Sequence, residues 1–212
     1  MKYKHIIFDF DGTLAETNAI RLDGFRVLFK EYPQSQVDEL ICYSQRNGGT
    51  SRYERIGYFF EKIRNVVISY EEINVFAEKY SKLVKEKVIA AVPVNGSLEF
   101  LTLHVKDYNF AVISGSDQQE LREVCRARKI EPFFVEILGS PTNKEQNLAE
   151  LLTRKRWKKD SSLFVGDSIN DLNAAESNGI DFVGCGSFGT DWNLNKNICL
   201  IDDLSQLEDC LN

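Results

Sequence analysis

The chain has 212 residues, enough for one large domain or for a core domain with an inserted module. Hydrophobic residues make up 43% of it and charged residues 27%, as in ordinary soluble globular proteins. The net charge of −6 argues against a nucleic-acid backbone as the main partner, because such partners require clustered lysine and arginine.

The sequence shows no signal for a membrane or for export. No stretch approaches the ~18 uninterrupted apolar residues of a membrane span. The short apolar run near the N-terminus ends in Asp9 and Asp11, so it cannot form the core of a signal peptide. We therefore expect a cytoplasmic protein without a membrane partner.

The cysteines are scattered and form no Cys-x-x-Cys pair: they are Cys42, Cys125, Cys185, Cys199 and Cys210. An odd number of cysteines without metal-ligand spacing is untypical of a zinc site or a disulfide framework. We expect buried free thiols in a reducing compartment.

Short apolar runs that end abruptly in acidic, small or hydroxyl residues indicate buried parallel strands. In chain order these runs are His5–Phe8, Asn109–Ile113, Ser162–Val165 and Asp181–Val183. Helices are predicted for amphipathic stretches over Asn95–Val105, Gln118–Lys129, Lys144–Arg154 and Asn170–Ser177. The alternation of strand and helix predicts an α/β fold with a doubly wound, Rossmann-like parallel sheet.

The interval after the first strand is long, rich in charged and aromatic residues, and without a convincing buried strand. Helices are predicted there over Ile20–Glu31, Arg52–Ile63 and Glu71–Val88. Asn95 is a candidate cap of the helix that follows the interval. We expect an α/β core domain formed by residues 1–16 and 91–212, and an inserted α-helical cap domain formed by residues 17–90.

The end of the first strand, Asp9-Phe10-Asp11-Gly12-Thr13, carries the most chemical information. Ligands of open α/β sheets bind beyond the carboxyl ends of the strands, where carboxylates at i and i+2 can face one site. Burying both without a cation is costly, and Mg²⁺, which prefers oxygen ligands, removes the conflict. Gly12 permits a tight turn, and Thr13 offers a hydroxyl or N–H group to a phosphate. A plain acidic turn is the alternative for this segment alone.

Two later segments add groups that suit a phosphate. Ser114, with the N–H groups of Gly115 and Ser116, can hold phosphate oxygens at the end of the second strand. Lys144, at the start of a helix, can neutralise charge on both the aspartates and a phosphate. Each has an ordinary alternative when taken alone, as a turn residue and as a surface lysine.

The end of the third strand supplies two more carboxylates, Asp167 and Asp171, four residues apart at the mouth of the sheet. Asp167 suits direct Mg²⁺ ligation, and Asp171 suits a supporting role that orients water or Lys144. Helix capping explains either aspartate alone, since acidic residues favour a helix N-terminus. Helix capping does not explain well why polar and charged residues follow several predicted strands together.

The four segments described above occur along the chain in the order Asp-Phe-Asp-Gly-Thr, Ile-Ser-Gly, a lone lysine and Gly-Asp-Ser-Ile-Asn-Asp. In this order they resemble the motifs of the haloacid dehalogenase-like hydrolases, and the resemblance covers essentially the whole chain. The insertion after the first motif is similar to the small helical cap of the phosphoglycolate phosphatase and β-phosphoglucomutase branch.

The resemblance implies a Mg²⁺-dependent phosphomonoester hydrolase that acts on a small phosphorylated metabolite. Asp9 would be the nucleophile that forms an aspartyl-phosphate. Asp11 would protonate the leaving group and then deprotonate the attacking water. Asp9, Asp167 and the backbone carbonyl of Asp11 would ligate the Mg²⁺ ion.

The remaining motif residues would hold the phosphate and the catalytic groups. By resemblance, Thr13 would orient Asp11, Ser114 would bind phosphate together with the Gly115 N–H group, and Lys144 would balance charge. Asp171 would support the metal ligand from outside its coordination sphere.

Arg52 is the most informative residue of the predicted cap. It follows a Gly-Gly loop and lies in the first turn of a predicted helix, behind Ser51 as a candidate cap. Arginine is unfavourable at a helix N-terminus, so a bound anion is one explanation. Resemblance to the mutase branch implies a second phosphate or another anion, and a plain surface arginine is the alternative.

Glu16 and Arg21 flank the entrance to the cap and are further candidates to face substrate. Arg21 stands where the mutases are expected to carry a histidine, which favours hydrolysis over the main alternative, a sugar phosphomutase. A non-catalytic binding scaffold is disfavoured because the chain keeps all of Asp9, Asp11, Lys144 and Asp167. We expect a monomer or weak homodimer.

Overall fold

The computed structural model of the protein describes residues 2–186 and 198–211. In this part of the chain, six parallel strands form one sheet in the order β3-β2-β1-β4-β5-β6. The strands are β1 (His5–Phe8), β2 (Asn109–Asp117), β3 (Phe134–Ser140), β4 (Ser162–Gly166), β5 (Asp181–Cys185) and β6 (Cys199–Ile201). The predicted α/β fold with a parallel sheet is confirmed.

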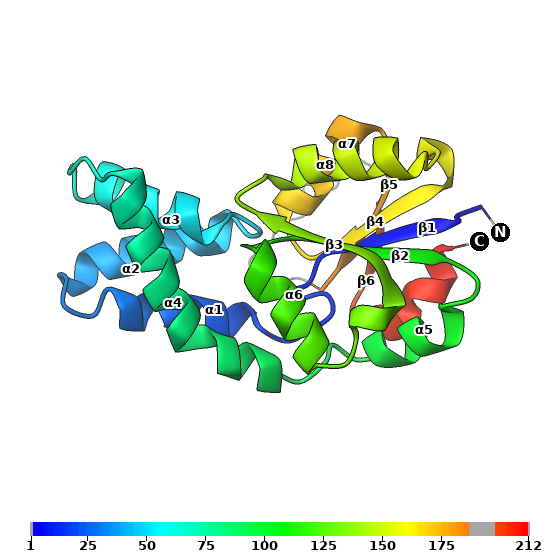
Figure 1. The fold of residues 1–212 in the computed structure, drawn as a ribbon, viewed down its shortest axis with the longest axis horizontal. Helices are drawn as coiled ribbons and strands as arrows, with labels where there is room; N and C mark the ends of the chain where they lie inside the picture. Colours follow the sequence, from blue (N-terminus) through cyan, green and yellow to red (C-terminus); the bar gives the residue numbers. More distant parts are fainter. Residues whose placement is uncertain (1, 187–197, 212) are drawn as a thin grey trace.

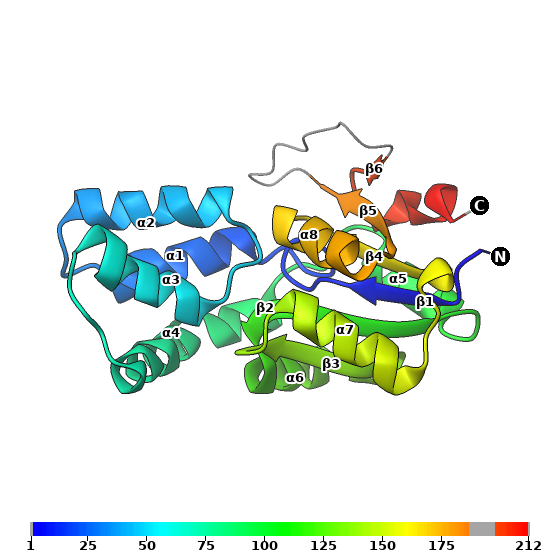
Figure 2. The same cartoon turned by 90° about the horizontal axis from the view of Figure 1, so that it is seen from above.

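Helices cover both faces of the sheet, as Figures 1 and 2 show. These helices are α5 (Ser97–His104) and α6 (Gln118–Ala127) on one face, and α7 (Lys144–Lys155) and α8 (Ile169–Asn178) on the other. Successive side chains of a strand point to opposite faces. Ile6 and Phe8 therefore pack with α5 and α6, and Ile7 packs with α7 and α8. Because both faces are covered, β1 reads as a continuous apolar run.

The chain between β1 and α5 forms a group of helices, which we call the cap. The cap lies to one side of the sheet (Figure 1). Its helices are α1 (Asn18–Leu28), α2 (Gln34–Arg46), α3 (Arg52–Tyr58), the π-helical turn Phe59–Ile63 and α4 (Tyr70–Ala90). The sequence analysis did not predict α2. An aromatic cluster holds the cap together, with the rings of Phe29 and Phe59 stacked at 4.0 Å between centroids.

The two connections between cap and core run side by side. The Glu16 N–H group donates to the Val92 carbonyl at 2.9 Å, and Ala15 forms an antiparallel bridge with Pro93. The Arg128 guanidinium of the core donates to the carbonyls that end α4, including that of Ala91 at 2.7 Å. The chain therefore passes from core to cap and back at one place, beyond the carboxyl end of the central strand β1.

Three local predictions differ from the structure. The first residue of α5 follows Gly96, which has a φ of 76°, so Asn95 is not the cap; its side chain binds Asp203 at 3.0 Å instead. The edge strands β3 and β6 were not predicted. β3 carries charge at Glu136 and is partly exposed, so it lacks the continuous apolar run of a buried strand.

The prediction of buried free thiols is correct only in part. Cys125 and Cys185 are buried and free, and Cys42 is free but exposed. Cys199 and Cys210 form a disulfide, which corrects the prediction for these two residues. The C-terminal 3₁₀ helix Leu204–Cys210 folds back along β6 and brings their Cα atoms to 6.2 Å, within the range that a disulfide spans.

Candidate active site

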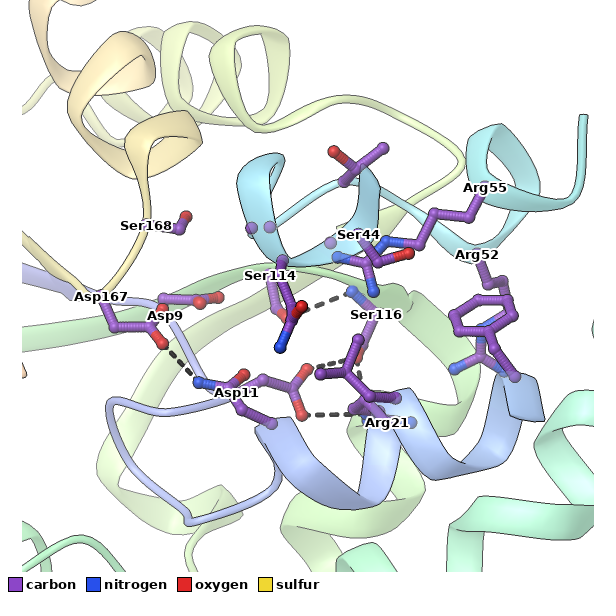
Figure 3. Close-up of a pocket in the computed structure, with 18 of the residues that line it drawn as sticks. Asp9, Asp11, Arg21, Ser44, Arg52, Arg55, Ser114, Ser116, Asp167 and Ser168 are labelled. Carbon is purple, nitrogen blue, oxygen red and sulfur yellow. Dashed lines mark hydrogen bonds and ion pairs between the residues drawn. The ribbon is translucent and has the colours of Figure 1, made fainter. Parts of the chain in front are cut away.

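The candidate site lies at the carboxyl ends of β1, β2 and β4, which are neighbours in the sheet. The strand order reverses at β1, and ligands of open α/β sheets bind at such a point. Asp9 follows β1, Ser114 lies near the end of β2, and Asp167 follows β4. Figure 3 shows these side chains facing one cavity, which the cap closes from the other side.

Asp9 is almost completely buried, at 2% exposure. Its Oδ1 atom lies 3.0 Å from Lys144 Nζ, but outside hydrogen-bond geometry. Burial first, and then the carboxylate of Asp171, raise the pKa of Asp9 to about 7 against the opposing charge of Lys144. A buried carboxylate with such a pKa is typical of a reactive site.

Asp167 is brought against the first motif by a close backbone approach at Gly12. Gly12 has a φ of 79°, and a Cβ atom there would lie 2.0 Å from Asp167 Oδ2. The Asn18 side chain of the cap donates to the same Oδ2 atom at 2.6 Å. Burial, Asp9 and Asp171 together raise the pKa of Asp167 well above its usual range. The sequence analysis missed Asn18.

The carboxylates of Asp9, Asp167 and Asp171 fit a divalent cation. One oxygen of each lies within 4.8 Å of the others, and all three residues are buried. When all three are ionised, Lys144 neutralises one negative charge and leaves two. A hard divalent cation with oxygen ligands offsets the two remaining negative charges. The pKa values of Asp9 and Asp167 are raised by burial and by the repulsion between these carboxylates, which such a cation would relieve.

Lys144 and Asp171 form the rear of this cluster. Lys144 Nζ lies 2.5 Å from Asp171 Oδ1, and two carboxylates outweigh burial to raise the pKa of Lys144, which keeps it charged. The other oxygen of Asp171 accepts from the Ser168 N–H group at 3.0 Å and from its hydroxyl at 2.5 Å. Asp171 thus caps α8 and also binds Lys144. Helix capping and the orientation of Lys144, which were alternatives from the sequence, are both observed.

Asp11 faces the cap and is held by three donors. Arg21 Nε lies 2.9 Å from Asp11 Oδ1, and the Ser116 hydroxyl donates to Asp11 Oδ2 at 2.7 Å (Figure 3). The Thr17 hydroxyl donates to Asp11 Oδ1 at 2.5 Å. Burial alone would raise the pKa of Asp11. The Arg21 charge and the hydrogen bonds outweigh it, so the pKa lies below its usual value.

Thr13 and Glu16 lie apart from the cavity. Thr13 is fully buried, and its hydroxyl has no hydrogen-bond partner within the described ranges. The contact to Asp11 that the resemblance implied for Thr13 is made by Thr17. Glu16 is exposed and lines no part of the cavity, whereas Arg21 does.

The glycine loop of the cap lies directly over the core residues of the site. A Cβ atom on Gly115 would meet the Gly49 carbonyl at 2.2 Å, so two backbones are in contact there. Gly49 itself has a φ of 79° and lies against Ser168 and Lys144. The Thr50 hydroxyl accepts from Asn170 at 3.2 Å. The loop therefore lies over the carboxyl end of β2 and the N-terminal ends of α7 and α8.

Arg52 is buried at the start of α3, where Ser51 caps the helix as expected. Its guanidinium makes a two-point ion pair with Glu120 of α6, at 2.8 Å and 2.7 Å. Glu120 also accepts from Arg21 Nη1 at 2.8 Å. Two cap arginines therefore share one core carboxylate. The sequence analysis missed Glu120, whose only signal was its place three residues after the capping residue Asp117.

The model of the haloacid dehalogenase-like hydrolase family matches residues 6–185, and the chain belongs to that family. The prediction of an enzyme is confirmed by this membership. A 5'-nucleotidase of Pseudomonas aeruginosa is 24% identical over 211 residues, covering 90% of this chain and 86% of the relative. A phosphoglycolate phosphatase of Haemophilus influenzae is 26% identical over 222 residues, covering 97% of each. These names agree with the predicted phosphatase class.

Solved structures show the same fold. That of a predicted phosphoglycolate phosphatase from Haemophilus somnus has a TM-score of 0.78 at 22% identity, covering 100% of this chain and 99% of that one. CbbY from Rhodobacter sphaeroides, in complex with phosphate, has a TM-score of 0.77 at 19% identity, covering 97% and 96%. Among the described helices of this chain, none has both the length and the apolar character of a membrane span.

Proposed function

We propose that the protein is a Mg²⁺-dependent phosphomonoester hydrolase that acts on a small phosphorylated metabolite through an aspartyl-phosphate on Asp9. The observation that carries the proposal is the buried cluster of Asp9, Asp167 and Lys144 at the end of β1, in the same cavity as Ser114. A nucleophile, a cation and a phosphate-binding hydroxyl are the parts that phosphoryl transfer requires.

The first chemical step is attack by an Asp9 carboxylate oxygen on the phosphorus atom. The bond between phosphorus and the ester oxygen breaks, and the leaving group departs as an alcohol once it gains a proton. Lys144 balances charge beside Asp9, and Ser114 and the Gly115 N–H group bind the phosphoryl oxygens. In the second step, water attacks the same phosphorus atom and restores the Asp9 carboxylate.

Asp11 is the proton-transfer group of the proposal. Its lowered pKa keeps it ionised beside Arg21, which is the form that takes a proton from the attacking water. Donating a proton to the leaving group needs the other form, which the Arg21 contact disfavours. The arrangement therefore prepares the base role of Asp11 more directly than the acid role.

The metal proposed is Mg²⁺, held by Asp9, Asp167 and the Asp11 carbonyl, with Asp171 as support. Three buried carboxylates, of which Asp9 and Asp167 have raised pKa values, fit an oxygen-preferring divalent cation. When bound, Mg²⁺ withdraws charge from the phosphoryl group. Ser168 and Lys144 hold Asp171 in place for this support.

The cavity supports a small substrate. Its volume is about 60 Å³, which holds only a few water molecules, and the cap contacts the core over it. One relative is named for phosphoglycolate, which is a small phosphate ester, and another for nucleotides, which are larger. The proposal includes a cytoplasmic enzyme that is a monomer or weak homodimer.

A phosphate-release screen over a few hundred phosphorylated metabolites, with Mg²⁺ and with chelator, tests the proposal. We expect release that requires the metal and is lost in Asp9→Asn. The sugar phosphomutase alternative predicts little net phosphate and a requirement for a bisphosphate. A folded wild-type protein without release or phosphate exchange on the whole panel would leave only the binding-scaffold alternative.

A further inference from the structure

We infer that the cap end of the cavity binds a second anionic group of the substrate, through Arg55 with Ser44. The substrate is then a phosphomonoester that carries another oxyanion, either a carboxylate or a second phosphate. This inference rests on the proposed function, because it assigns the far end of the same site. Figure 3 shows Arg55 and Ser44 on one side of the cavity, with Asp9 and Asp167 on the other.

Arg55 is a buried cation without a counter-ion in the described ranges. It lies on α3, is 8% exposed, and lines the cavity that contains Asp9. Its Nη2 atom donates to the Asn47 carbonyl at a long 3.4 Å, and its Nε–H group has no hydrogen-bond partner among those residues. Its guanidinium carbon lies over the Phe25 ring, 5.7 Å from the ring centroid. A buried charge in this state is costly, and an anionic ligand offsets that cost.

The other two cap arginines of the cavity are already neutralised. Arg52 and Arg21 both bind Glu120, and Arg21 also binds Asp11. An anion that approached Arg52 would have to compete with a two-point ion pair at 2.8 Å and 2.7 Å. The free guanidinium is therefore that of Arg55, three residues beyond the arginine that the sequence singled out.

Ser44 provides an independent observation at the same end. It lies on α2, is 2% exposed, and lines the same cavity. Its hydroxyl also has no hydrogen-bond partner among the described residues. Buried polar groups are nearly always hydrogen-bonded in native proteins, so two unpartnered ones lining one cavity indicate a missing ligand.

The chemistry of the two groups selects an anion. A guanidinium has only donors, arranged in a fork that matches the oxygens of a carboxylate or a phosphate. A serine hydroxyl adds a donor to one of those oxygens. An amine or an apolar tail would leave the Arg55 charge buried and unpaired. Carboxylate and phosphate share the required oxygens, so the two sources must be separated by experiment.

The test compares esters that differ only at the far end: ethyl phosphate, 2-phosphoglycolate and ethane-1,2-diol bisphosphate, each with Mg²⁺. For the wild type we expect a higher kcat/KM for the ester whose second anion fits. In Arg55→Gln, the ratio of that kcat/KM to the value for ethyl phosphate should fall about 10- to 100-fold, the range of a charge-assisted hydrogen bond. Ser44→Ala should lower the same ratio by a smaller factor.

The controls separate binding from folding. Arg46→Gln removes an exposed arginine near the end of α2 that does not line the cavity, and should leave the ratio unchanged. Arg55→Lys keeps the charge and should restore part of the preference. A purely structural role for Arg55 would lower kcat/KM for all three esters equally, and an unchanged ratio in a folded Arg55→Gln variant overturns the inference.

Calorimetric titration distinguishes a failure of this inference from a failure of the proposed function. In the Asp9→Asn background, which prevents turnover, the better of the two esters with a second anionic group should bind at least tenfold more tightly than ethyl phosphate. Adding Arg55→Gln should remove that difference. Equal binding of all three esters overturns the second anion site even where hydrolysis is observed. If an ester with a second anionic group binds preferentially but the wild type hydrolyses none of the esters, the second anion site is supported and the proposed hydrolase function is overturned.

Discussion

Arg21 of the cap lies 2.9 Å from Asp11 of the core and holds its carboxylate in the ionised form. Arg21, which lies in the cap, thus influences the protonation of Asp11, the residue proposed to transfer protons. Both residues are largely buried, so the pair is only weakly screened by solvent.

The first prediction concerns this pair. Arg21→Gln removes the charge that keeps the pKa of Asp11 low, so the pKa rises and a higher pH is needed to ionise the carboxylate. The acidic limb of the rate of phosphate release should therefore move to higher pH. Arg21→Lys keeps the charge and should leave the limb closer to that of the wild type.

The matched control for this prediction is Arg26→Gln, which removes an exposed arginine of the same helix that pairs, among the described residues, with Asp23. It should leave the pH profile unchanged. If the acidic limb of Arg21→Gln coincides with that of the wild type, Asp11 is not the group that titrates there.

The second prediction separates the two catalytic aspartates by burst kinetics. An aryl phosphate with a good leaving group needs little acid assistance. Asp11→Asn should therefore release about one equivalent of aryl alcohol quickly and phosphate about 10²- to 10⁴-fold more slowly than the wild type. Asp9→Asn should show no burst, because it lacks the nucleophile. A burst in Asp9→Asn would contradict an intermediate on that residue.

The third prediction concerns Glu120, which binds both Arg21 and Arg52. Glu120→Gln leaves two buried cations short of a counter-charge and should destabilise the protein by about 3–5 kcal/mol near neutral pH, measured by denaturant unfolding. Glu123→Gln on the same helix is the control. Its partner Lys85 and Glu123 itself are both partly exposed, so the change should be much smaller.

The pH dependence of this effect has a defined sign. Burial alone would raise the pKa of Glu120, but Arg52 and Arg21 lower it to about 2. A lowered pKa stabilises the fold above the unfolded value of about 4.5 and loses that effect as the pH falls toward 2. The stability difference between wild type and Glu120→Gln should therefore shrink on acidification below about pH 4.5. A constant difference would show that the ion pair is not its source.

The fourth prediction concerns the loop over the site. Gly49→Ala places a Cβ atom 2.7 Å from Ser168 Oγ and 3.0 Å from Lys144 Nζ, at a φ of 79°. The loop must then move away from Lys144, so kcat/KM should fall while the core remains folded. Gly57→Ala is the control, because its Cβ meets nothing closer than Ile73 at 3.8 Å and lies within α3. It should stabilise the cap by about 0.5–1 kcal/mol. Equal activity in both variants would contradict a role for the close approach.

The sequence predicted the central strands and the residues at their ends, because a strand buried on both faces needs an apolar run and its ligand-binding end needs polar residues. It did not predict β3, since an edge strand with an exposed face can carry Glu136, which pairs with Lys155. With Glu136 inside it, β3 has neither the continuous apolar run of a strand buried on both faces nor the strict alternation of a half-buried one.

The partners of the site residues were less predictable than the residues themselves. Arg52 was singled out as a candidate anion ligand, but its partner Glu120 lies 68 residues away, and only the tertiary fold, in which α4 packs against both α3 and α6, brings them together. The same packing leaves Arg55 unpaired, which no local pattern could indicate. Charges that are far apart in the chain are paired by tertiary contacts, and spacing in the sequence does not record them.

The paired linkers at Glu16 and Val92 have a mechanical consequence. Because they are hydrogen-bonded to each other, they behave as one short ribbon, and twisting either alone breaks the bond between them. The helices of the cap are packed together by a shared aromatic cluster, so they would rotate about that ribbon as one unit. A rotation of the cap about the ribbon separates the Gly49 backbone from Gly115, Ser168 and Lys144 of the core, so even a small rotation would open the cavity to solvent.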